Sequence, residues 1–165
     1  MKIGLFFGSF NPVHTGHLIV AEQMLEASGL DKVWFVLSPQ NPFKLQQNLL
    51  DQQLRFRLLQ RAVEGNNRFE ASDVEFHLSL PSYTIHTLEH LHALHPEHQF
   101  SLIMGSDNLS GFEKWKDYES ILSNYSILVY RRGEVDEKWN HAPTVHLFDV
   151  PYIHISATFI REAVR

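Results

Sequence analysis

The sequence contains no cysteine among its 165 residues. This absence excludes disulfides, metal sites built on thiolates and enzymes that use a cysteine nucleophile. The chemistry must therefore come from histidine, carboxylate, hydroxyl and cationic side chains. With 44% hydrophobic and 20% charged residues, the chain is expected to form a single globular domain over residues 1–165.

Long apolar runs are also missing. The longest ones, "IGLFFG", "VWFVLS" and "FSLIMG", fall far short of the roughly 20 residues that a membrane helix needs, and the N-terminus lacks a signal-like segment. We therefore expect a cytoplasmic protein with no membrane partner. The formal net charge of -5 argues against binding of a nucleic-acid polymer, although a local cluster of cations can still bind a nucleotide. No feature of the sequence specifies an oligomeric state.

Short apolar runs alternate with segments of helical period. The expected strands are Lys2 to Phe7, Val33 to Ser38, Phe69 to Glu75, Gln99 to Met104, Ser126 to Tyr130 and Val145 to Phe148. The expected helices are Gly16 to Ala27, Asp51 to Glu64, Tyr83 to Leu94 and about Trp115 to Leu122. Their apolar stripes are Leu18, Ala21 and Leu25, then Leu54, Leu58 and Ala62, then Ile85, Leu88 and Leu91. This alternation predicts an α/β fold, a Rossmann-like three-layer domain with a mainly parallel central sheet.

The stretch "GSFNPVHTGH", Gly8 to His17, lies where the first strand gives way to the first helix. In an open parallel sheet this is where ligands gather, and a helix N-terminus favours an anion such as phosphate. His14 and His17 can add hydrogen bonds, and a neighbouring anion would favour their charged form. Zinc ligation by this His-x-x-His pair is the competing interpretation. No third ligand follows at an informative spacing, so phosphate is preferred.

A second group of histidines lies in and after the third expected helix. Although His86 and His90 share a helical face, the sequence has no His-Glu-x-x-His pattern there, and a solvated face is preferred over a metal site. The group comprises His86, His90, His92, His95 and His98.

The opening stretch resembles the His-x-Gly-His signature of the nucleotidyltransferase superfamily. Near the other end, "ISATFIREAVR" resembles its second motif, Ser-x-Thr-x-x-Arg. Ser156 and Thr158 are natural helix N-caps, and Arg161 follows one turn later with a fork suited to phosphate. Together with "SPQNPFK", "PSYTIHTL" and "GSDNLSGFEKWKDYESIL", these motifs resemble the bacterial nicotinate-nucleotide adenylyltransferase family over nearly the whole chain.

The resemblance implies an enzyme that joins the AMP moiety of ATP to nicotinate mononucleotide and releases pyrophosphate. It implies ATP and nicotinate mononucleotide as partners, and Mg²⁺ held mainly by the ATP phosphates as the cofactor, with no protein metal site. The implied catalytic residues are His14 and His17 at the reacting phosphate, with Lys44 and Arg161 at the β- and γ-phosphates. The implied ATP-binding residues are Gly8, Ser9, Phe10, Gly105, Asp107, Ser156 and Thr158, and Asp107 would meet the ribose. Thr84 and Trp115 would line the acceptor pocket around the pyridine ring.

Some features depart from the family pattern. The family usually has histidine where Phe43 stands and often aspartate where His86 stands, and its members tend to continue beyond the second motif, whereas this sequence ends at Arg165. Either the last segment is lost or the chain is incomplete. Alternative acceptors are nicotinamide mononucleotide and phosphopantetheine. Alternatives of another class are a nucleotide-binding module without catalysis and a metal-dependent hydrolase that uses His14 and His17.

Overall fold

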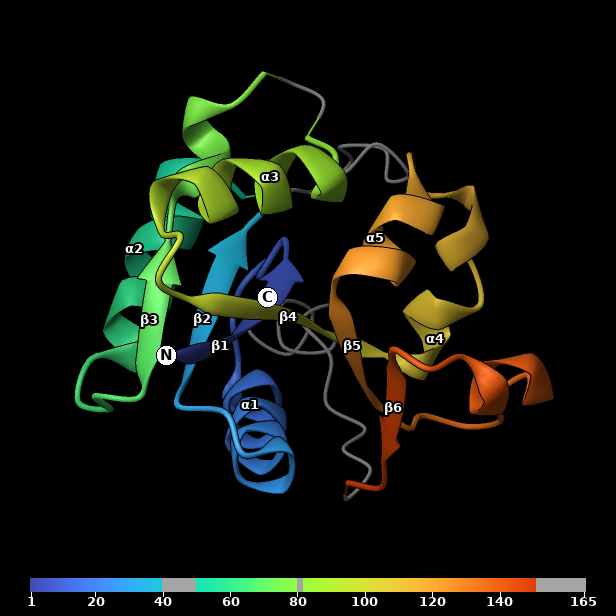
Figure 1. The fold of residues 1–165 in the computed structure, drawn as a ribbon. Helices are drawn as coiled ribbons and strands as arrows, with labels where there is room; N and C mark the ends of the chain where they lie inside the picture. The colour runs from blue at the N-terminus through green and yellow to red at the C-terminus, as the bar shows by residue number, and fades with distance from the viewer. Residues whose placement is uncertain (40–49, 80–81, 151–165) are drawn as a thin grey trace.

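The computed structural model describes residues 1–39, 50–79 and 82–150. Six parallel strands form one sheet in the order β3-β2-β1-β4-β5-β6 (Figure 1). The strands are β1 (Lys2–Gly8), β2 (Lys32–Leu37), β3 (Phe69–Ser72), β4 (Gln99–Gly105), β5 (Ser126–Tyr130) and β6 (Val145–Phe148).

The first strand lies inside the sheet and pairs with β2 on one side and β4 on the other. The chain winds outward from β1 through β2 to β3, crosses back to β4, and continues outward through β5 to β6. The winding direction therefore reverses between β1 and β4. In open parallel sheets such a reversal leaves a crevice at the carboxyl ends of the two strands, and ligands bind there.

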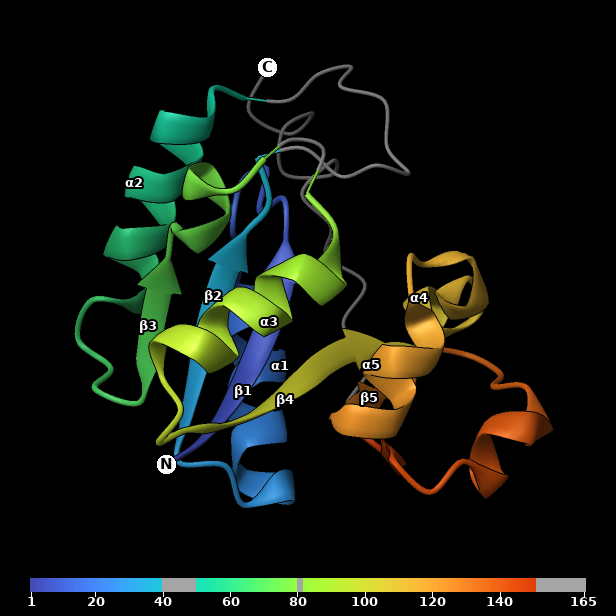
Figure 2. The same cartoon turned by 45° about the horizontal axis from the view of Figure 1, so that its top comes forward.

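Helices cover both faces of the sheet (Figure 2). They are α1 (Thr15–Ser28), α2 (Gln52–Val63), α3 (Thr84–Leu94), α4 (Ser106–Leu109) and α5 (Tyr118–Asn124). Short 3₁₀ turns are η1 (Val74–His77), η2 (Phe112–Lys114) and η3 (Glu137–His141). No helix in the described ranges is long and apolar enough to cross a membrane.

Alternate side chains of each inner strand pack into two separate hydrophobic cores, one on each face of the sheet. On β1, Leu5 belongs to the core that includes Leu88 of α3, whereas Phe6 belongs to the core that includes Leu25 of α1. Successive residues of a strand point to opposite faces, so a sheet covered on both sides needs apolar residues at consecutive positions. The apolar runs in the sequence are unbroken because both faces of each inner strand are buried. The predicted three-layer parallel fold is confirmed.

The predicted apolar stripe of α2 is wrong. Leu54 and Leu58 are exposed, and the buried side is formed by Arg55, Leu59 and Val63. The helical period was right, but the phase is shifted by one residue. The reason is that the Arg55 guanidinium bonds to backbone carbonyls at the edge of the core, a role that a search for apolar residues does not detect.

The third strand is shorter than predicted and ends at Ser72, because η1 turns the chain away from the sheet. This turn buries the side chain of Glu75, whose carboxylate accepts a hydrogen bond of 2.7 Å from the Thr87 hydroxyl on α3. Burial raises the pKa of Glu75 above its ordinary value. The fourth predicted helix begins at Tyr118 rather than near Trp115, since η2 occupies the preceding residues.

Candidate active site

The connection from β1 to α1 ends in a helix cap made by two histidines. His14 is the N-cap of α1, and its Nδ1 accepts a hydrogen bond of 3.1 Å from the Gly16 amide. The Nδ1 atom of His17 accepts a bond of 3.1 Å from the His14 amide. Each imidazole therefore satisfies one of the amides that a helix N-terminus leaves without an intrahelical partner.

The two rings stack, with centroids 3.9 Å apart and planes inclined by 27°. The His17 ring also meets the edges of Phe6 and Phe10, at centroid distances of 6.2 and 5.1 Å. Because both Nδ1 atoms accept amide protons, the hydrogen bonds assign the ring protons to Nε2 in the neutral form. The pair thus offers two N–H donors at the positive end of α1.

The structure favours the uncharged form of both histidines. Burial lowers the pKa of His17 to about 3, with further contributions from the charges of His14 and Arg132. Burial, followed by the Arg132 charge, also lowers the pKa of His14. We expected a bound anion to favour the charged form, but in the protein alone the shift is in the opposite direction. An apolar wall of phenylalanines and a neighbouring cation both disfavour protonation.

This shift predicts a pH dependence of folding stability. The unfolded chain protonates His17 near its ordinary pKa of 6.5, whereas the folded protein does so only near 3. The unfolded state binds more protons between these values, so the free energy of unfolding falls as the pH falls from 6.5 to about 3. Urea titrations at about pH 7, 6 and 5 measure the loss. His17→Asn keeps an acceptor for the amide but has no titrating ring and should lose less. Equal losses in both proteins would contradict the assignment.

A buried arginine of α2 holds the loop that precedes the histidines. Arg55 is 2% exposed and donates to the carbonyl oxygens of Ser9 at 2.8 Å, Ser38 at 3.1 Å, Leu50 at 2.9 Å and Pro39 at 3.3 Å. It thereby links the loops that follow β1 and β2 at the carboxyl edge of the sheet. The sequence analysis missed Arg55, because nothing in the sequence distinguishes it from Arg57 and Arg61, the exposed arginines of the same helix.

Two predicted glycines sit where a side chain would not fit. A Cβ atom on Gly8 would lie 3.0 Å from the Phe10 ring. A Cβ atom on Gly105, at the end of β4, would lie 2.4 Å from the Asp107 carboxylate and 3.0 Å from the Tyr130 ring. Asp107 thus lies close over the end of β4, the strand that pairs with β1.

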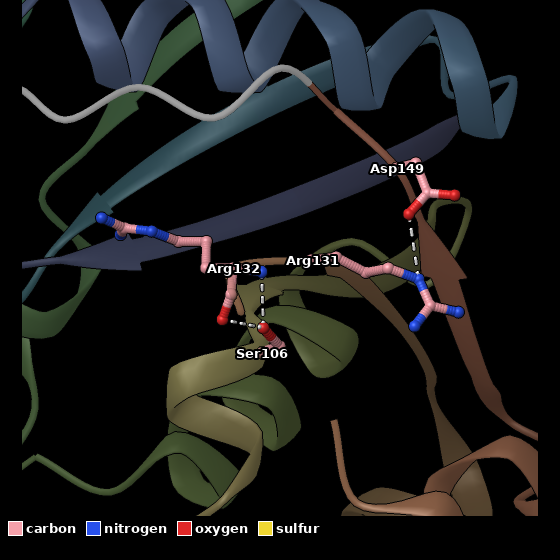
Figure 3. Close-up of polar contacts among 4 residues, drawn as sticks. All are labelled: Ser106, Arg131, Arg132 and Asp149. Carbon is pink, nitrogen blue, oxygen red and sulfur yellow. Dashed lines mark hydrogen bonds and ion pairs between the residues drawn. The ribbon is translucent and has the colours of Figure 1, made fainter. Parts of the chain in front are cut away.

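Arg132 follows β5 and is a second residue that the sequence analysis missed. Its amide donates to the Ser106 hydroxyl at 2.6 Å, and the same hydroxyl donates to its carbonyl oxygen at 3.0 Å. Figure 3 shows the Arg132 side chain extended away from Arg131, whose Nε pairs with Asp149 at 3.1 Å. The positive charge of Arg132 also lowers the pKa of both histidines. The available signal was "YRRG", two cations directly after a buried strand.

The two predicted acceptor residues lie on neighbouring segments. Thr84 is the first residue of α3, and Trp115 follows η2 and packs on Phe112 with ring centroids 5.1 Å apart. Both side chains are partly exposed. The ammonium of Lys116 lies 4.8 Å from the centre of the Tyr83 ring, and this contact brings the two segments together. The start of α3 and the residues after η2 are therefore neighbours in the fold.

Comparison with known proteins places the chain in a family. Residues 5–163 match the cytidylyltransferase-like family. Relatives named probable nicotinate-nucleotide adenylyltransferase include one from Bacteroides fragilis, 52% identical over 99% of this chain and 82% of its own length. Another, from Flavobacterium johnsoniae, is 48% identical over 100% of this chain and 87% of its own length. The chain belongs to the nicotinate-nucleotide adenylyltransferase family.

Solved structures of similar proteins share the fold. A Plasmodium falciparum nicotinic acid mononucleotide adenylyltransferase complexed with NaAD has a TM-score of 0.82 at 21% identity, covering 98% of this chain and 82% of that one. A putative nicotinate-nucleotide adenylyltransferase from Vibrio parahaemolyticus has a TM-score of 0.72 at 25% identity, covering 98% and 85%. The six-stranded parallel sheet is thus the architecture of this adenylyltransferase family.

Four residues that the family motifs predict lie outside the described residues, namely Lys44, Ser156, Thr158 and Arg161. In the described part of this adenylyltransferase, the predicted histidines and ATP-binding residues lie at or after the ends of two strands that are neighbours in the sheet. Gly8, Ser9, Phe10, His14 and His17 come at or after the end of β1, and Gly105 and Asp107 at or after the end of β4. They border the crevice where the winding of the sheet reverses.

Proposed function

We propose that the protein transfers the AMP moiety of ATP to nicotinate mononucleotide, giving deamido-NAD and pyrophosphate. The observation that carries this proposal is the stacked pair His14 and His17 on the N-terminus of α1, with both Nδ1 atoms used by backbone amides. Uncharged N–H donors at a helix N-terminus, next to the cation of Arg132, form a site for phosphate oxygens.

The reaction needs no protein nucleophile. A phosphate oxygen of the acceptor attacks the α-phosphorus of ATP, and the bond from that phosphorus to the oxygen bridging to the β-phosphate breaks. Pyrophosphate leaves with the electron pair of the broken bond. The protein then acts by holding the two phosphates in line and by stabilising charge on the phosphoryl oxygens.

Each part of the site has a role in this scheme. His14 and His17 donate from Nε2 to oxygens of the reacting phosphate, and Arg132 adds positive charge beside them. By the family motifs, Lys44 and Arg161 would bind the β- and γ-phosphates, and Ser156 and Thr158 would contribute to the ATP site. The backbone from Gly8 to Phe10 and the Gly105 strand end contact the nucleotide, while Asp107 accepts hydrogen bonds from the ribose hydroxyls.

Magnesium enters this scheme with ATP, as part of the substrate. Mg²⁺ prefers oxygen ligands and is usually bound through substrate phosphates in nucleotide sites. Within the described residues, three or more histidine or acidic groups close enough to hold a metal occur only at His95, Glu97 and His98, in the turn after α3. The described side of the candidate active site therefore offers donors for phosphate rather than a carboxylate cage for a metal.

The decisive experiment compares three acceptors. Pyrophosphate release from MgATP is measured with nicotinate mononucleotide, nicotinamide mononucleotide and phosphopantetheine in parallel. The proposal expects the highest kcat/KM with nicotinate mononucleotide. Binding of ATP without pyrophosphate release would instead indicate a non-catalytic nucleotide-binding module, and preference for another acceptor would overturn the substrate assignment. A cytoplasmic location stays a prediction.

Substitution of Trp115 tests whether this residue lines the pocket for nicotinate mononucleotide. Its ring is partly exposed, and stacking on the pyridine ring would contribute about 1 kcal/mol. Trp115→Ala is therefore expected to raise KM for nicotinate mononucleotide about fivefold while changing KM for ATP less than about twofold. Steady-state kinetics with each substrate varied in turn give both values, and Trp115→Phe should restore most of the loss. An equal rise in both KM values would contradict a specific contact with the acceptor.

A further inference from the structure

The turn between α3 and β4 gathers three metal-binding side chains at the amino ends of the strands, the edge opposite the candidate active site. One ligand atom from each of His95, Glu97 and His98 lies within 4.8 Å of the other two. His95 Nδ1 is 3.9 Å from a Glu97 carboxylate oxygen. Figure 2 shows this connection beside the N-terminus of the chain.

The sequence analysis preferred a solvated face over a metal site for these histidines, and the structure shows that His95 and His98 are only partly exposed to solvent. Helix α3 ends at Leu94, so both residues belong to the turn that follows it. Both rings are partly buried and meet the Trp34 ring edge to face, at centroid distances of 5.4 Å for His95 and 5.9 Å for His98. The two imidazoles stack with centroids 5.5 Å apart.

The backbone and the N-terminus hold this turn in place. The His95 amide donates to the Leu91 carbonyl at 2.9 Å, and the His98 amide donates to the His95 carbonyl at 3.1 Å. The Met1 ammonium lies 3.4 Å from His98 Nδ1, and the Met1 carbonyl accepts a bond of 2.9 Å from the Gln99 amide. The backbone of the turn is therefore positioned before any ligand arrives, and binding would mainly require the exposed Glu97 side chain to close on the ion.

We propose that His95, Glu97 and His98 bind one divalent transition-metal ion of the zinc class. Two imidazoles and one carboxylate are a common donor set for Zn²⁺ and are poorly suited to Mg²⁺, which takes oxygen ligands. Water would complete the coordination. The ion would join the end of α3 to the start of β4 next to the N-terminal strand, so its role is structural and separate from nucleotidyl transfer.

The test uses the full chain without a histidine tag, titrated with ZnCl₂, CoCl₂ and MgCl₂. The proposal expects one equivalent of Co²⁺ to bind with visible d–d absorption and to quench Trp34 fluorescence, because Trp34 contacts both rings. Zinc at a hundredfold excess over its Kd should raise the Tm by about 5–10 °C. Magnesium at the same concentration should do neither.

Substitutions of the proposed ligands test where the ion binds. His98→Asn and Glu97→Ala should each abolish the zinc-dependent rise in Tm, and Glu97→Ala does so without removing a ring from the Trp34 packing. The matched control is His92→Asn, an exposed histidine of α3 that should keep the full response. Pyrophosphate release should be unchanged in Glu97→Ala, which separates this proposal from the catalytic one. Equal metal responses in wild type and Glu97→Ala, or no Co²⁺ absorption, would overturn it.

Discussion

His17→Ala is expected to lower the rate of pyrophosphate release by about 10² to 10³, the typical cost of removing one donor that stabilises developing charge. The Nε2–H of His17 is the group that is lost. It would meet oxygens of the reacting phosphate, while most contacts to ATP lie elsewhere along the nucleotide. The loss should therefore appear in kcat, with KM for ATP changed much less, in steady-state kinetics with saturating nicotinate mononucleotide.

An asparagine control separates catalysis from helix capping. The alanine variant also removes the Nδ1 atom that accepts from the His14 amide, which should cost about 1 kcal/mol of stability. His17→Asn supplies an oxygen near that position but has no Nε2–H. It should recover most of the stability and none of the rate. Turnover close to wild type in either variant would refute the role assigned to His17.

Arg55→Met is expected to have the largest effect on stability, a loss of about 3 kcal/mol or more in the free energy of unfolding. Methionine fills a similar volume but leaves four carbonyl oxygens without the donors that Arg55 supplies, among them Ser9 O at 2.8 Å and Leu50 O at 2.9 Å. Carbonyl groups left buried and unpaired carry most of this cost. Urea unfolding followed by circular dichroism measures it.

The matched control is Arg57→Met, which removes an exposed arginine from the same helix and should change stability by less than about 0.5 kcal/mol. Arg55→Lys tests whether charge alone is enough. A lysine carries one donor group on a flexible stem and cannot reach carbonyls on two separate loops, so it should behave more like methionine than like arginine. Full stability in the lysine variant would show that the forked hydrogen bonding is unimportant.

The strands were predictable because parallel strands that are covered on both faces appear in the sequence as short, unbroken apolar runs. Runs such as Val33 to Leu37 are apolar at every position, since alternate side chains enter two different cores. The three longer helices α1, α2 and α3 were located correctly by period and by breakers, but the short helix α4 was missed and the buried face of α2 was wrong. A reading based on apolar residues cannot anticipate that Arg55 is drawn inward by carbonyls contributed from distant loops.

The parts of the candidate site that are formed by short motifs next to one another in the sequence could be predicted. A histidine pair in a Gly- and Pro-containing loop before a helix predicts a phosphate site, and Gly105 and Asp107 lie at the end of β4, the strand that pairs with β1. The protonation state was not predictable. It depends on how the rings of Phe6 and Phe10 pack on His17, and on the charge of Arg132, which follows β5 and acts on the histidines only in the folded chain.

The central position of β1 has a consequence for synthesis on the ribosome. The strands β1, β2 and β3 emerge first and can pair with one another, but the other edge of β1 must wait for β4, which begins only at Gln99. During that interval an apolar strand presents unpaired backbone groups, the condition under which wrong partners add to a sheet. The second edge of β1 is therefore covered only after the chain has been made and released from the ribosome beyond Gly105, the end of β4.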